Sequence, residues 1–575
     1  MEMEKKNLAI IILAVVLAAS GVGNIILGIN QGFITLQPEA KESLIIGDLS
    51  GPVDLDPVDS WDQASWDVLR QCVEGLLFYN VSDEDLPLTP WLATGYTFVD
   101  TTHINFNLRT GVTFHDGTAF NADAVVWNFD RLLHFMNHTG TLPSGLSPAK
   151  IHSLFEFPDG SPIISSMDKT GEYSVQLVLN GPYTSILGLL AFAATNILSP
   201  TYHEAQGHLD AYIDTSADRV VGTGPYEYIE YVTDDYVKMV RYDDYWMEPV
   251  MFDELIFDVI DDSTTRNYAM LAGDIDYLFG SMSDLWDTFN ASPWIHFEAL
   301  ERPNLGYQYL GMNNKQINVT WRKAISYAIN YTYILDEMWL GAFVKSYGPI
   351  SPGYAAYFDS NTVNIAPYFN LTIARQALID DPGIDTTGLT ASDDDEDPLW
   401  EAANLNSLNY SYNTDNWFRA DLYVVLSEWL EDIGISLADG GTDWAYFLYR
   451  AYGYVPGGYD ELQLYWVGWG PDYLDPMNMI QPLLSNNSVS NSAQVNDPWL
   501  ESKIVDYYAE PSEAVRIQII KDLSNYIAGT LYPHAFGYHS RTRAVHAADL
   551  YNVAYNVAGN FWAYPIKRNL TWTPS

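Results

Sequence analysis

The sequence predicts an α/β protein, because stretches with the two-residue period of strands alternate along the chain with stretches of helical spacing. Hydrophobic residues make up 48% of the 575 residues and aromatic residues 14%, which is enough for large packed cores rather than disorder. This length corresponds to about three or four domain-sized units. No fixed-period repeat and no long low-complexity linker divides the chain.

Alternating apolar and polar residues mark the predicted strands. The clearest case is a hairpin, in which residues 226–232 and 236–242 are joined by Thr233-Asp234-Asp235. An extended segment is expected at residues 304–312. The same pattern predicts further strands at residues 44–49, 103–108, 173–179, 254–260 and 462–467.

Apolar residues at helical spacing predict helices between these strands. Asn121 is expected to cap the start of one helix, and Gly273 to end another. The helices are expected at residues 66–79, 122–133, 264–272, 321–340, 421–433 and 513–528.

The N-terminus has the features of a segment directed to a membrane. Lys5 and Lys6 precede residues 8–29, an uncharged run that is long enough to cross a bilayer. This predicts an N-terminal transmembrane helix with the rest of the chain outside the cytoplasm. The small residues Ala18-Ala19-Ser20 leave a cleaved signal peptide open as the alternative. Residues 1–30 are therefore expected to be an anchor or signal, and residues 31–43 a linker.

The charge balance excludes nucleic acid as a partner. The chain has 74 Asp and Glu against 27 Lys and Arg, a net charge of −47, and such a surface repels phosphates and anionic lipid headgroups. The single cysteine, Cys72, rules out an intramolecular disulfide and a zinc site of several cysteines. Its apolar neighbours favour a packing role.

Asn-x-Ser/Thr triplets are acceptors for N-linked glycans in proteins outside the cytoplasm, so this chain is expected to be a glycoprotein. The alternative is that most of its triplets carry no glycan. Asn-x-Ser/Thr triplets begin at Asn80, Asn137, Asn290, Asn318, Asn330, Asn370, Asn409, Asn486 and Asn569.

No sequence signature of catalysis is present, since the chain has no Gly-x-Ser-x-Gly, P-loop or His-Glu-x-x-His motif. His534, His539 and His546 lie close in sequence but lack the spacing of metal ligands. Residues 393–397 have the carboxylates of a calcium loop, but Pro398 stands where the turn glycine belongs. We therefore expect no catalytic residue, no metal and no cofactor. A binding protein is favoured over an enzyme, with an external hydrolase as the least favoured alternative.

Several short motifs follow one another in order along the chain. They are Leu55-Asp56-Pro57, Val-Glu-Gly-Leu at 73–76, Phe-Asn-Leu-Arg-Thr-Gly-Val-Thr-Phe-His-Asp-Gly at 106–117, Val-Gly-Thr-Gly-Pro-Tyr at 221–226, Gly-Asp-Ile-Asp at 273–276, Trp-Arg-Lys-Ala-Ile-Ser-Tyr-Ala-Ile-Asn at 321–330 and Gly-Trp-Gly-Pro-Asp-Tyr-Leu-Asp-Pro at 468–476. In this order and spacing, the chain resembles the family 5 extracellular solute-binding proteins of ABC importers, the oligopeptide- and dipeptide-binding type. The resemblance extends from about residue 44 to about residue 565.

The resemblance implies a two-lobed fold of the type II periplasmic-binding-protein kind, with two crossover strands near residues 305–313 and 531–541. Lobe I would comprise residues 44–310, with a subdomain inserted at about 80–215, and residues 536–575. Lobe II would comprise residues 311–535. The resemblance also implies that a peptide is captured in the cleft between the lobes and delivered to the permease subunits of an ABC importer. The body is expected to be monomeric.

The resemblance also implies a ligand-binding segment around residues 466–476. An aspartate matching Asp472 holds the ammonium terminus of the ligand in peptide-binding members, and an ammonium taken from water needs such a carboxylate. Trp469 matches an aromatic residue that lines a side-chain pocket. The extended backbone from Val467 to Gly470 can pair with a peptide as an added strand, and Trp466 completes the predicted site.

Two features depart from the pattern. Pro471 removes a backbone donor that a paired peptide could use. No base clearly receives the carboxylate of the ligand, and Arg419 and Arg450 are candidates because bases are rare in this region. The main alternative keeps the fold and changes the ligand to an oligosaccharide, because sugar faces stack on Trp and Tyr. Asp472 favours the peptide.

Overall fold

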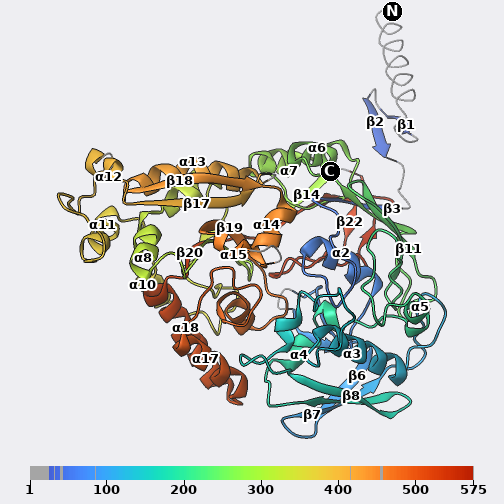
Figure 1. Ribbon diagram of the computed structural model, residues 1–575. Coiled ribbons are helices and arrows are strands. Elements are labelled where there is room, and N and C mark those ends of the chain that lie inside the picture. Colours follow the sequence, from blue (N-terminus) through green and yellow to red (C-terminus); the bar gives the residue numbers. More distant parts are fainter. Residues whose placement is uncertain are drawn as a thin grey trace, which may run out of the picture.

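The computed structural model describes residues 25–30, 33–38, 43–83, 86–395, 397–414, 416–453 and 457–573. The predicted α/β architecture is confirmed in these residues, which form three principal sheets with helices packed against them (Figure 1). We call the part with the seven-stranded and four-stranded sheets lobe I, and the part with the six-stranded sheet lobe II.

The seven-stranded sheet of lobe I combines segments from distant parts of the chain. In spatial order its strands are β10 (Tyr226–Val232), β11 (Tyr236–Arg241), β12 (Glu254–Val259), β3 (Ser43–Asp48), β13 (Tyr277–Leu278), β21 (Arg543–Ala547) and β14 (Ile295–Ala299). The predicted hairpin is confirmed as the antiparallel pair β10 and β11. Strand β3 lies between two parallel neighbours, β12 and β13, and its Leu44 and Ile46 are fully buried.

The four-stranded sheet of lobe I lies within the predicted subdomain. It is antiparallel, in the order β6 (Ala93–Phe98), β7 (His103–Leu108), β9 (Ser174–Leu179) and β8 (Ile164–Gly171). Helix α3 (Ala122–Met136) packs on β8 and β9. Its cap is as predicted, since Asn121 Oδ1 accepts the backbone N–H of Ala124.

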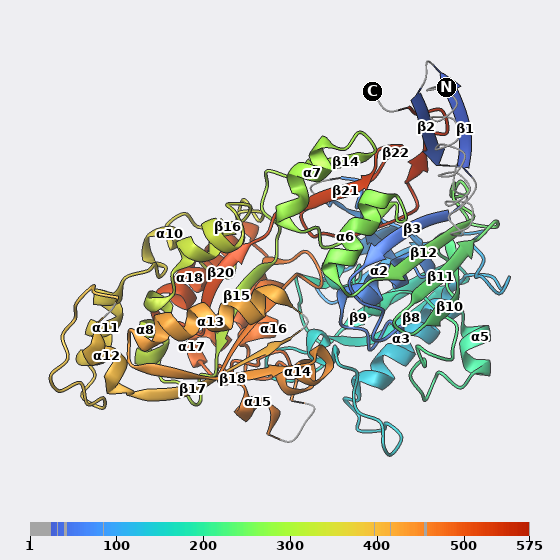
Figure 2. The ribbon, with the colours of Figure 1, turned by 90° about the horizontal axis from the view of Figure 1, so that it is seen from above.

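The six-stranded sheet forms the core of lobe II. Its strands, in spatial order, are β16 (Val344–Lys345), β20 (His534–His539), β15 (Tyr307–Met312), β19 (Leu464–Trp469), β17 (Asn406–Asn413) and β18 (Ile435–Thr442). Helix α13 (Trp417–Glu431) packs on β17 and β18, and α8 (Val319–Ala328) packs on β20. Figure 2 shows this sheet and the seven-stranded sheet at opposite ends of the molecule.

The remaining elements are short or lie on the surface. Other strands are β1 (Ile25–Asn30), β2 (Phe33–Pro38), β4 (Leu77–Tyr79), β5 (Leu88–Pro90), β22 (Leu550–Tyr551) and β23 (Lys567–Arg568). Other α-helices are α2 (Gln63–Cys72), α4 (Ile186–Leu189), α5 (Pro200–Ala205), α6 (Ser263–Ala272), α7 (Trp286–Ala291), α9 (Tyr331–Tyr333), α10 (Thr362–Ile365), α11 (Leu371–Ile379), α12 (Pro398–Ala403), α14 (Trp444–Ala451), α15 (Gly458–Glu461), α16 (Gln481–Leu484), α17 (Pro498–Ala509) and α18 (Glu513–Tyr526). Short 3₁₀ and π turns lie at His152–Phe155, Ala193–Thr195, Ser283–Leu285, Ile334–Met338, Pro476–Met479 and Ile527–Leu531.

The chain passes twice between the two large sheets, after β14 and before β21. Asn304 links the two passages, because its backbone N–H donates to the Ser540 carbonyl over 2.8 Å and its Oδ1 accepts the Thr542 N–H over 3.0 Å. Strands β15 and β20 both lie in the six-stranded sheet. Lobe II was predicted to span residues 311–535. Its sheet extends a few residues beyond both limits, because β15 starts at Tyr307 and β20 ends at His539.

Two local expectations need correction. The helix predicted at residues 66–79 ends at Cys72, because Val73 is extended and Glu74 forms a bridge with Ile197. The transmembrane helix predicted at residues 8–29 lies mostly outside the described residues, and its last part belongs to β1, which pairs with β2. In the described part of the chain, no helix combines the length and hydropathy needed to span a membrane.

A buried ion pair fixes the first predicted motif to helix α3. Arg131 Nη1 donates to Asp56 Oδ1 over 2.9 Å, and both side chains are almost completely buried. Burial by itself raises the pKa of the Asp56 carboxyl, but Arg131 and two backbone N–H groups hold this pKa below its usual value. Burying two charges is costly, and removing one partner leaves the other charge uncompensated.

We predict that Arg131→Met lowers the free energy of unfolding by about 3–5 kcal/mol, because it strands the Asp56 carboxylate in the core. The matched control is Lys169→Met, which breaks an exposed pair with Asp123 and costs at most about 1 kcal/mol. Urea denaturation followed by circular dichroism measures both. Equal losses in the two variants would contradict the prediction.

Candidate ligand-binding site

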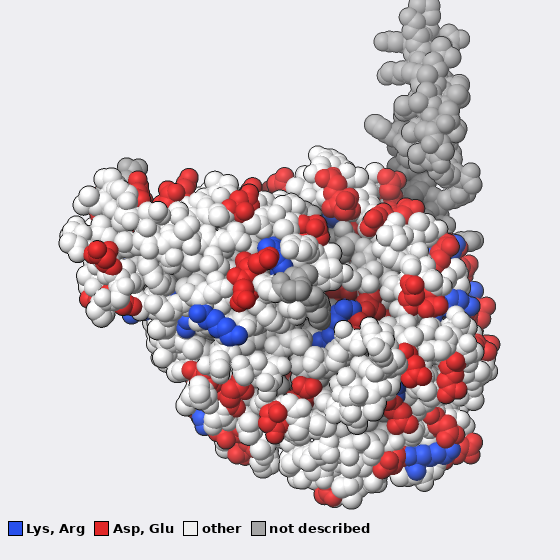
Figure 3. Space-filling view, in the orientation of Figure 1, with Lys and Arg blue, Asp and Glu red and all other residues white. Residues whose placement is uncertain are grey.

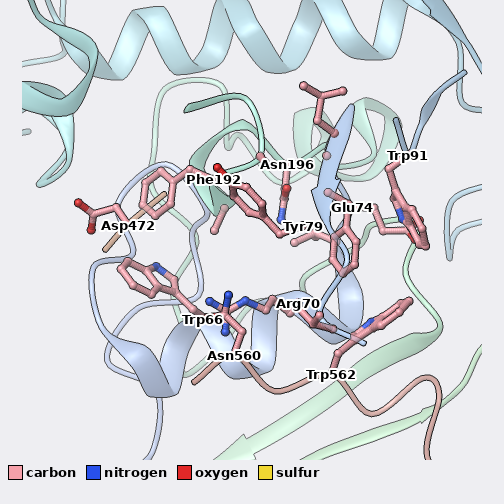
Figure 4. Close-up of a pocket in the computed structure, with 17 residues that line it drawn as sticks. Trp66, Arg70, Glu74, Tyr79, Trp91, Phe192, Asn196, Asp472, Asn560 and Trp562 are labelled. Carbon is pink, nitrogen blue, oxygen red and sulfur yellow. The ribbon is translucent and has the colours of Figure 1, made fainter. Parts of the chain in front are cut away.

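A pocket lies between helix α2 of lobe I and the loop that follows β19 of lobe II (Figure 4). Aromatic rings form much of its wall, namely those of Trp66, Phe78, Tyr79, Trp91, Phe192 and Trp562. Its charged lining residues are Arg70, Glu74 and Asp472, and Asn196 and Asn560 add neutral polar groups. A concave space walled by aromatic rings, with a few convergent polar groups, is typical of a small-molecule site.

The structure divides the predicted segment 466–476 between the cavity and the core. Asp472 lines the cavity. Trp469 lies next to it, where its indole N–H donates to the Asn478 carbonyl over 3.0 Å and its ring meets the edge of Trp61. Trp466 is fully buried in the core of lobe II and packs against Phe418, so we leave it out of the proposed site.

Strand β19 has an unpaired edge in this region. It pairs with β15 along its whole length, but with β17 only at Leu464 and Tyr465. Among the residues that the structure describes, β19 therefore has no strand neighbour on its β17 side from Trp466 onward. Gly470 is exposed, and a Cβ placed there would meet no atom within 4 Å. The backbone from Val467 to Gly470 is thus suited to accept an added strand.

The Asp472 carboxylate is weakly compensated for a buried charge. Its side-chain partner is Asn478, whose Nδ2 donates to Oδ2 over 2.9 Å, and no Lys, Arg or His among the described residues forms an ion pair with it. Desolvation raises the pKa of Asp472 to about 7, and the neighbouring polar groups of Asn478 and Trp61 oppose this rise only in part. A cation bound beside Asp472 would supply the missing compensation.

Glu74 lies in the wall of the same cavity but is fully satisfied. Its two oxygens accept hydrogen bonds of 2.7–2.9 Å from Trp91, Thr223, Tyr245 and Trp246. Burial raises the pKa of Glu74, and these four donors oppose the rise. Four donors leave this carboxylate little capacity for a ligand, so we assign Glu74 to the framework of lobe I.

The two bases predicted as carboxylate receptors are engaged elsewhere. Arg419 donates to the Asn413 Oδ1 over 2.5 Å and lies over the ring of Trp444. Arg450 is buried and donates to the Thr442 hydroxyl over 3.1 Å. Neither lines the cavity. Arg70 does line the cavity. No sequence pattern singles it out, because α2 is separated from Asp472 by about 400 residues of chain.

Contacts between the lobes lie near Asp472 in the sequence. Tyr183 of lobe I stacks on Tyr508 of lobe II at 4.3 Å between ring centroids, and its hydroxyl lies 3.0 Å from that of Tyr473. Asp475 accepts hydrogen bonds from Ser185 of lobe I and from the Tyr507 hydroxyl. Asp475 is thus used to join the lobes, three residues from Asp472.

Within the described residues, no group of three His, Cys, Asp or Glu side chains is placed to hold a metal ion. Near the acidic run at 393–397, the Arg375 guanidinium donates to the carbonyls of Ser392 and Asp394. Acidic side chains are spread over the molecular face in Figure 3, while basic ones form a few small groups.

The raised pKa of Asp472 predicts how this residue affects stability. A carboxyl whose pKa is higher in the folded state destabilises the fold as pH rises from the unfolded value near 4 to the folded value of about 7. Wild type should therefore lose thermal stability over this range relative to Asp472→Asn, which has no charge to bury. Melting temperatures of both proteins from pH 4 to pH 8 measure the difference. Parallel curves would contradict the prediction.

Known proteins resemble this chain in sequence and in fold. The model of the "Bacterial extracellular solute-binding proteins, family 5 Middle" matches residues 87–491. Heme-binding protein A of Haemophilus influenzae is 26% identical over 482 residues, which cover 80% of each chain. Glutathione-binding protein GsiB of Escherichia coli is 26% identical over 338 residues, 58% of this chain and 61% of that one.

Solved structures of binding proteins share the fold. A dipeptide-binding protein from Pseudoalteromonas, in complex with Met-Leu, has a TM-score of 0.77 at 20% identity and covers 92% of this chain and 100% of its own. The oligopeptide-binding protein AppA from Bacillus subtilis, in complex with a nonapeptide, has a TM-score of 0.75 at 20% identity and covers 93% and 100%. The predicted two-lobed fold is confirmed, and the family match over most of the chain shows that this protein belongs to the family 5 bacterial extracellular solute-binding proteins.

Proposed function

We propose that this protein captures peptides outside the cytoplasm, in the cavity between its lobes, and delivers them to the permease of an ABC importer without chemistry of its own. The observation that carries the proposal is the half-buried Asp472 carboxylate, which lines the cavity and has no cation partner among the described residues. A peptide brings an ammonium group, which is a cation with hydrogen-bond donors. Binding would compensate a charge that the protein leaves uncompensated.

The unpaired edge of β19 supports a peptide over other cations. A peptide laid along Val467–Gly470 can exchange backbone hydrogen bonds with this edge, as an added strand does. Pro471 ends the row of donors, since it has no backbone N–H, and Asp472 follows directly. The main chain of the peptide would then end with its ammonium at Asp472. Trp469 and Gly470 would contact the first residues of the ligand.

The aromatic wall favours an oligosaccharide as the second candidate. Trp66, Trp91 and Trp562 offer flat faces to the same cavity, and sugar rings stack on such faces. This candidate gives no role to the uncompensated charge of Asp472, so we rank it below the peptide. The relatives described above are named for binding haem, glutathione and dipeptides.

The proposed location is the outer side of the cytoplasmic membrane. We propose that the N-terminal segment, with its uncharged run at residues 8–29, either holds the protein there or is cleaved on export. Glycosylation at exposed triplets such as Asn318, Asn486 and Asn569 belongs to the same proposal. The partners are then the peptide and the permease subunits, with a monomeric body.

Short peptides should raise the melting temperature of the protein, because a ligand that binds only the folded state stabilises it. N-acetylation of the peptide should abolish the shift, since it removes the cation. Asp472→Asn should weaken binding about 30-fold or more, because it removes one partner of a buried charge pair. Isothermal titration calorimetry measures the affinities. Shifts with cello-oligomers but not with peptides would overturn the proposal in favour of the oligosaccharide.

Peptide affinity should also depend on pH, with a sign fixed by Asp472. The free protein holds this carboxyl protonated below its pKa of about 7, and the ammonium needs the ionised form. Affinity should therefore rise up to about tenfold per pH unit from pH 5 to pH 7, and proton release should accompany binding. Calorimetry in buffers of different ionisation enthalpy counts these protons, and a pH-independent affinity would contradict the assignment.

A further inference from the structure

Two arginines without an acidic partner among the described residues lie where the chain returns to lobe I. Arg541 and Arg543 are two positions apart, one just before β21 and one at its start, and both side chains are partly exposed. Figure 2 shows β21, β14 and α7 together at one end of the seven-stranded sheet. Neither arginine lines the cavity that contains Asp472, so both lie outside the candidate ligand-binding site.

The Arg543 guanidinium is held in place by neutral groups of both lobes. Its Nη2 donates to the carbonyl of Ala342, in lobe II, over 3.0 Å. Its Cζ lies 4.8 Å from the ring centroid of Trp286, at the start of α7 in lobe I, and this ring in turn contacts Phe297 of β14. A guanidinium stacked on an indole keeps its charge and its remaining donors available for a ligand.

Several donors of the two guanidinium groups are unmet. Nη1 of Arg543 and Nε of Arg541 are shielded from solvent and have no hydrogen-bond acceptor among the described residues. An unmet donor on a charged group is costly to bury. Because both side chains are partly exposed, an ion can reach them from solvent, and a turn about the last side-chain torsions presents the unmet N–H groups to it.

The charges around these arginines leave the same need. Burial and the neighbouring positive charge of Arg541 lower the pKa of Arg543, and Glu301 opposes this change from a distance at which no ion pair forms. Elsewhere in the described structure, buried arginines such as Arg131 and Arg568 have carboxylate partners. The chain has 74 Asp and Glu, yet two neighbouring guanidinium groups have no counterion.

We infer that Arg541 and Arg543 bind a small divalent oxyanion of the phosphate or sulfate type, at the junction of the two lobes. Two guanidinium forks can together donate to several oxygens of one tetrahedral ion, and the ion supplies the missing negative charge. A free ion is the expected ligand, since the acidic surface repels anionic lipid headgroups. This inference is independent of the proposed function, because the two sites share no residue.

Calorimetry of the wild-type protein at pH 7.5 tests the inference with sodium phosphate, sodium sulfate and sodium acetate, each at an ionic strength matched with sodium chloride. We expect phosphate and sulfate to bind at least about 10-fold more tightly than acetate, because a planar monoanion offers fewer acceptors and less charge to the pair. Equal affinity for acetate would assign the pair to a carboxylate and contradict the inference. No binding of phosphate or sulfate above the chloride background would also overturn it.

Variants of Arg541 assign the effect to this pair. Arg541 donates no hydrogen bond to a described residue, so Arg541→Gln should fold normally while weakening the binding of phosphate about 10- to 100-fold. Arg541→Lys should recover part of the loss, since it keeps the charge without the fork. Lys169→Gln makes the same charge change on the exposed strand β8 and serves as control. If Arg541→Gln and Lys169→Gln weaken binding equally, phosphate responds to net charge alone and the inference is wrong.

Two further measurements locate the ion and identify its source. In crystals grown with selenate, we expect an anomalous selenium peak within hydrogen-bonding distance of both Arg541 and Arg543, and selenate bound only elsewhere would overturn the inference. Sedimentation with phosphatidylglycerol vesicles should leave the protein in the supernatant. Binding to these vesicles that Arg541→Gln abolishes would assign the pair to a lipid headgroup and contradict the free ion.

Discussion

A carboxylate removed from water needs a cation or several hydrogen-bond donors, and this requirement organises the molecule. Asp56 meets it with Arg131 and so fixes the start of lobe I to helix α3. Glu74 meets it with four neutral donors and so ties together three segments of lobe I. Asp475 meets it with donors from both lobes. Asp472 alone of these four carboxylates falls short, and it is the one that lines the cavity.

The loop after β19 links ligand binding to lobe contact. Asp472 and Asp475 are three residues apart, one turned to the cavity and the other to Ser185 of lobe I. A ligand held at Asp472 therefore lies against the segment that joins the lobes. Tyr183, stacked on Tyr508, extends the same contact with neutral rings, which associate without adding charge to an acidic molecule.

Lys and Arg are scarce in this chain, so the role of each buried arginine can be considered in turn. With 27 Lys and Arg against 74 Asp and Glu, most buried guanidinium groups have a structural partner. Arg131 pairs with Asp56, and Arg375 donates to the carbonyls of Ser392 and Asp394. Arg70 differs because only one of its nitrogens is engaged and the side chain faces the cavity.

The sequence by itself determined the α/β pattern, the hairpin at 226–241, the cap at Asn121 and the family, since each depends on residues within a few positions of one another or on motif order. It did not determine which face of β19 meets the core. A period of two places Trp466 and Val467 on opposite faces, but only the packing of lobe II against its own helices puts Trp466 inside. The cavity was also beyond the sequence, because Arg70 and Asp472 approach each other through chain reversals that local periodicity does not encode.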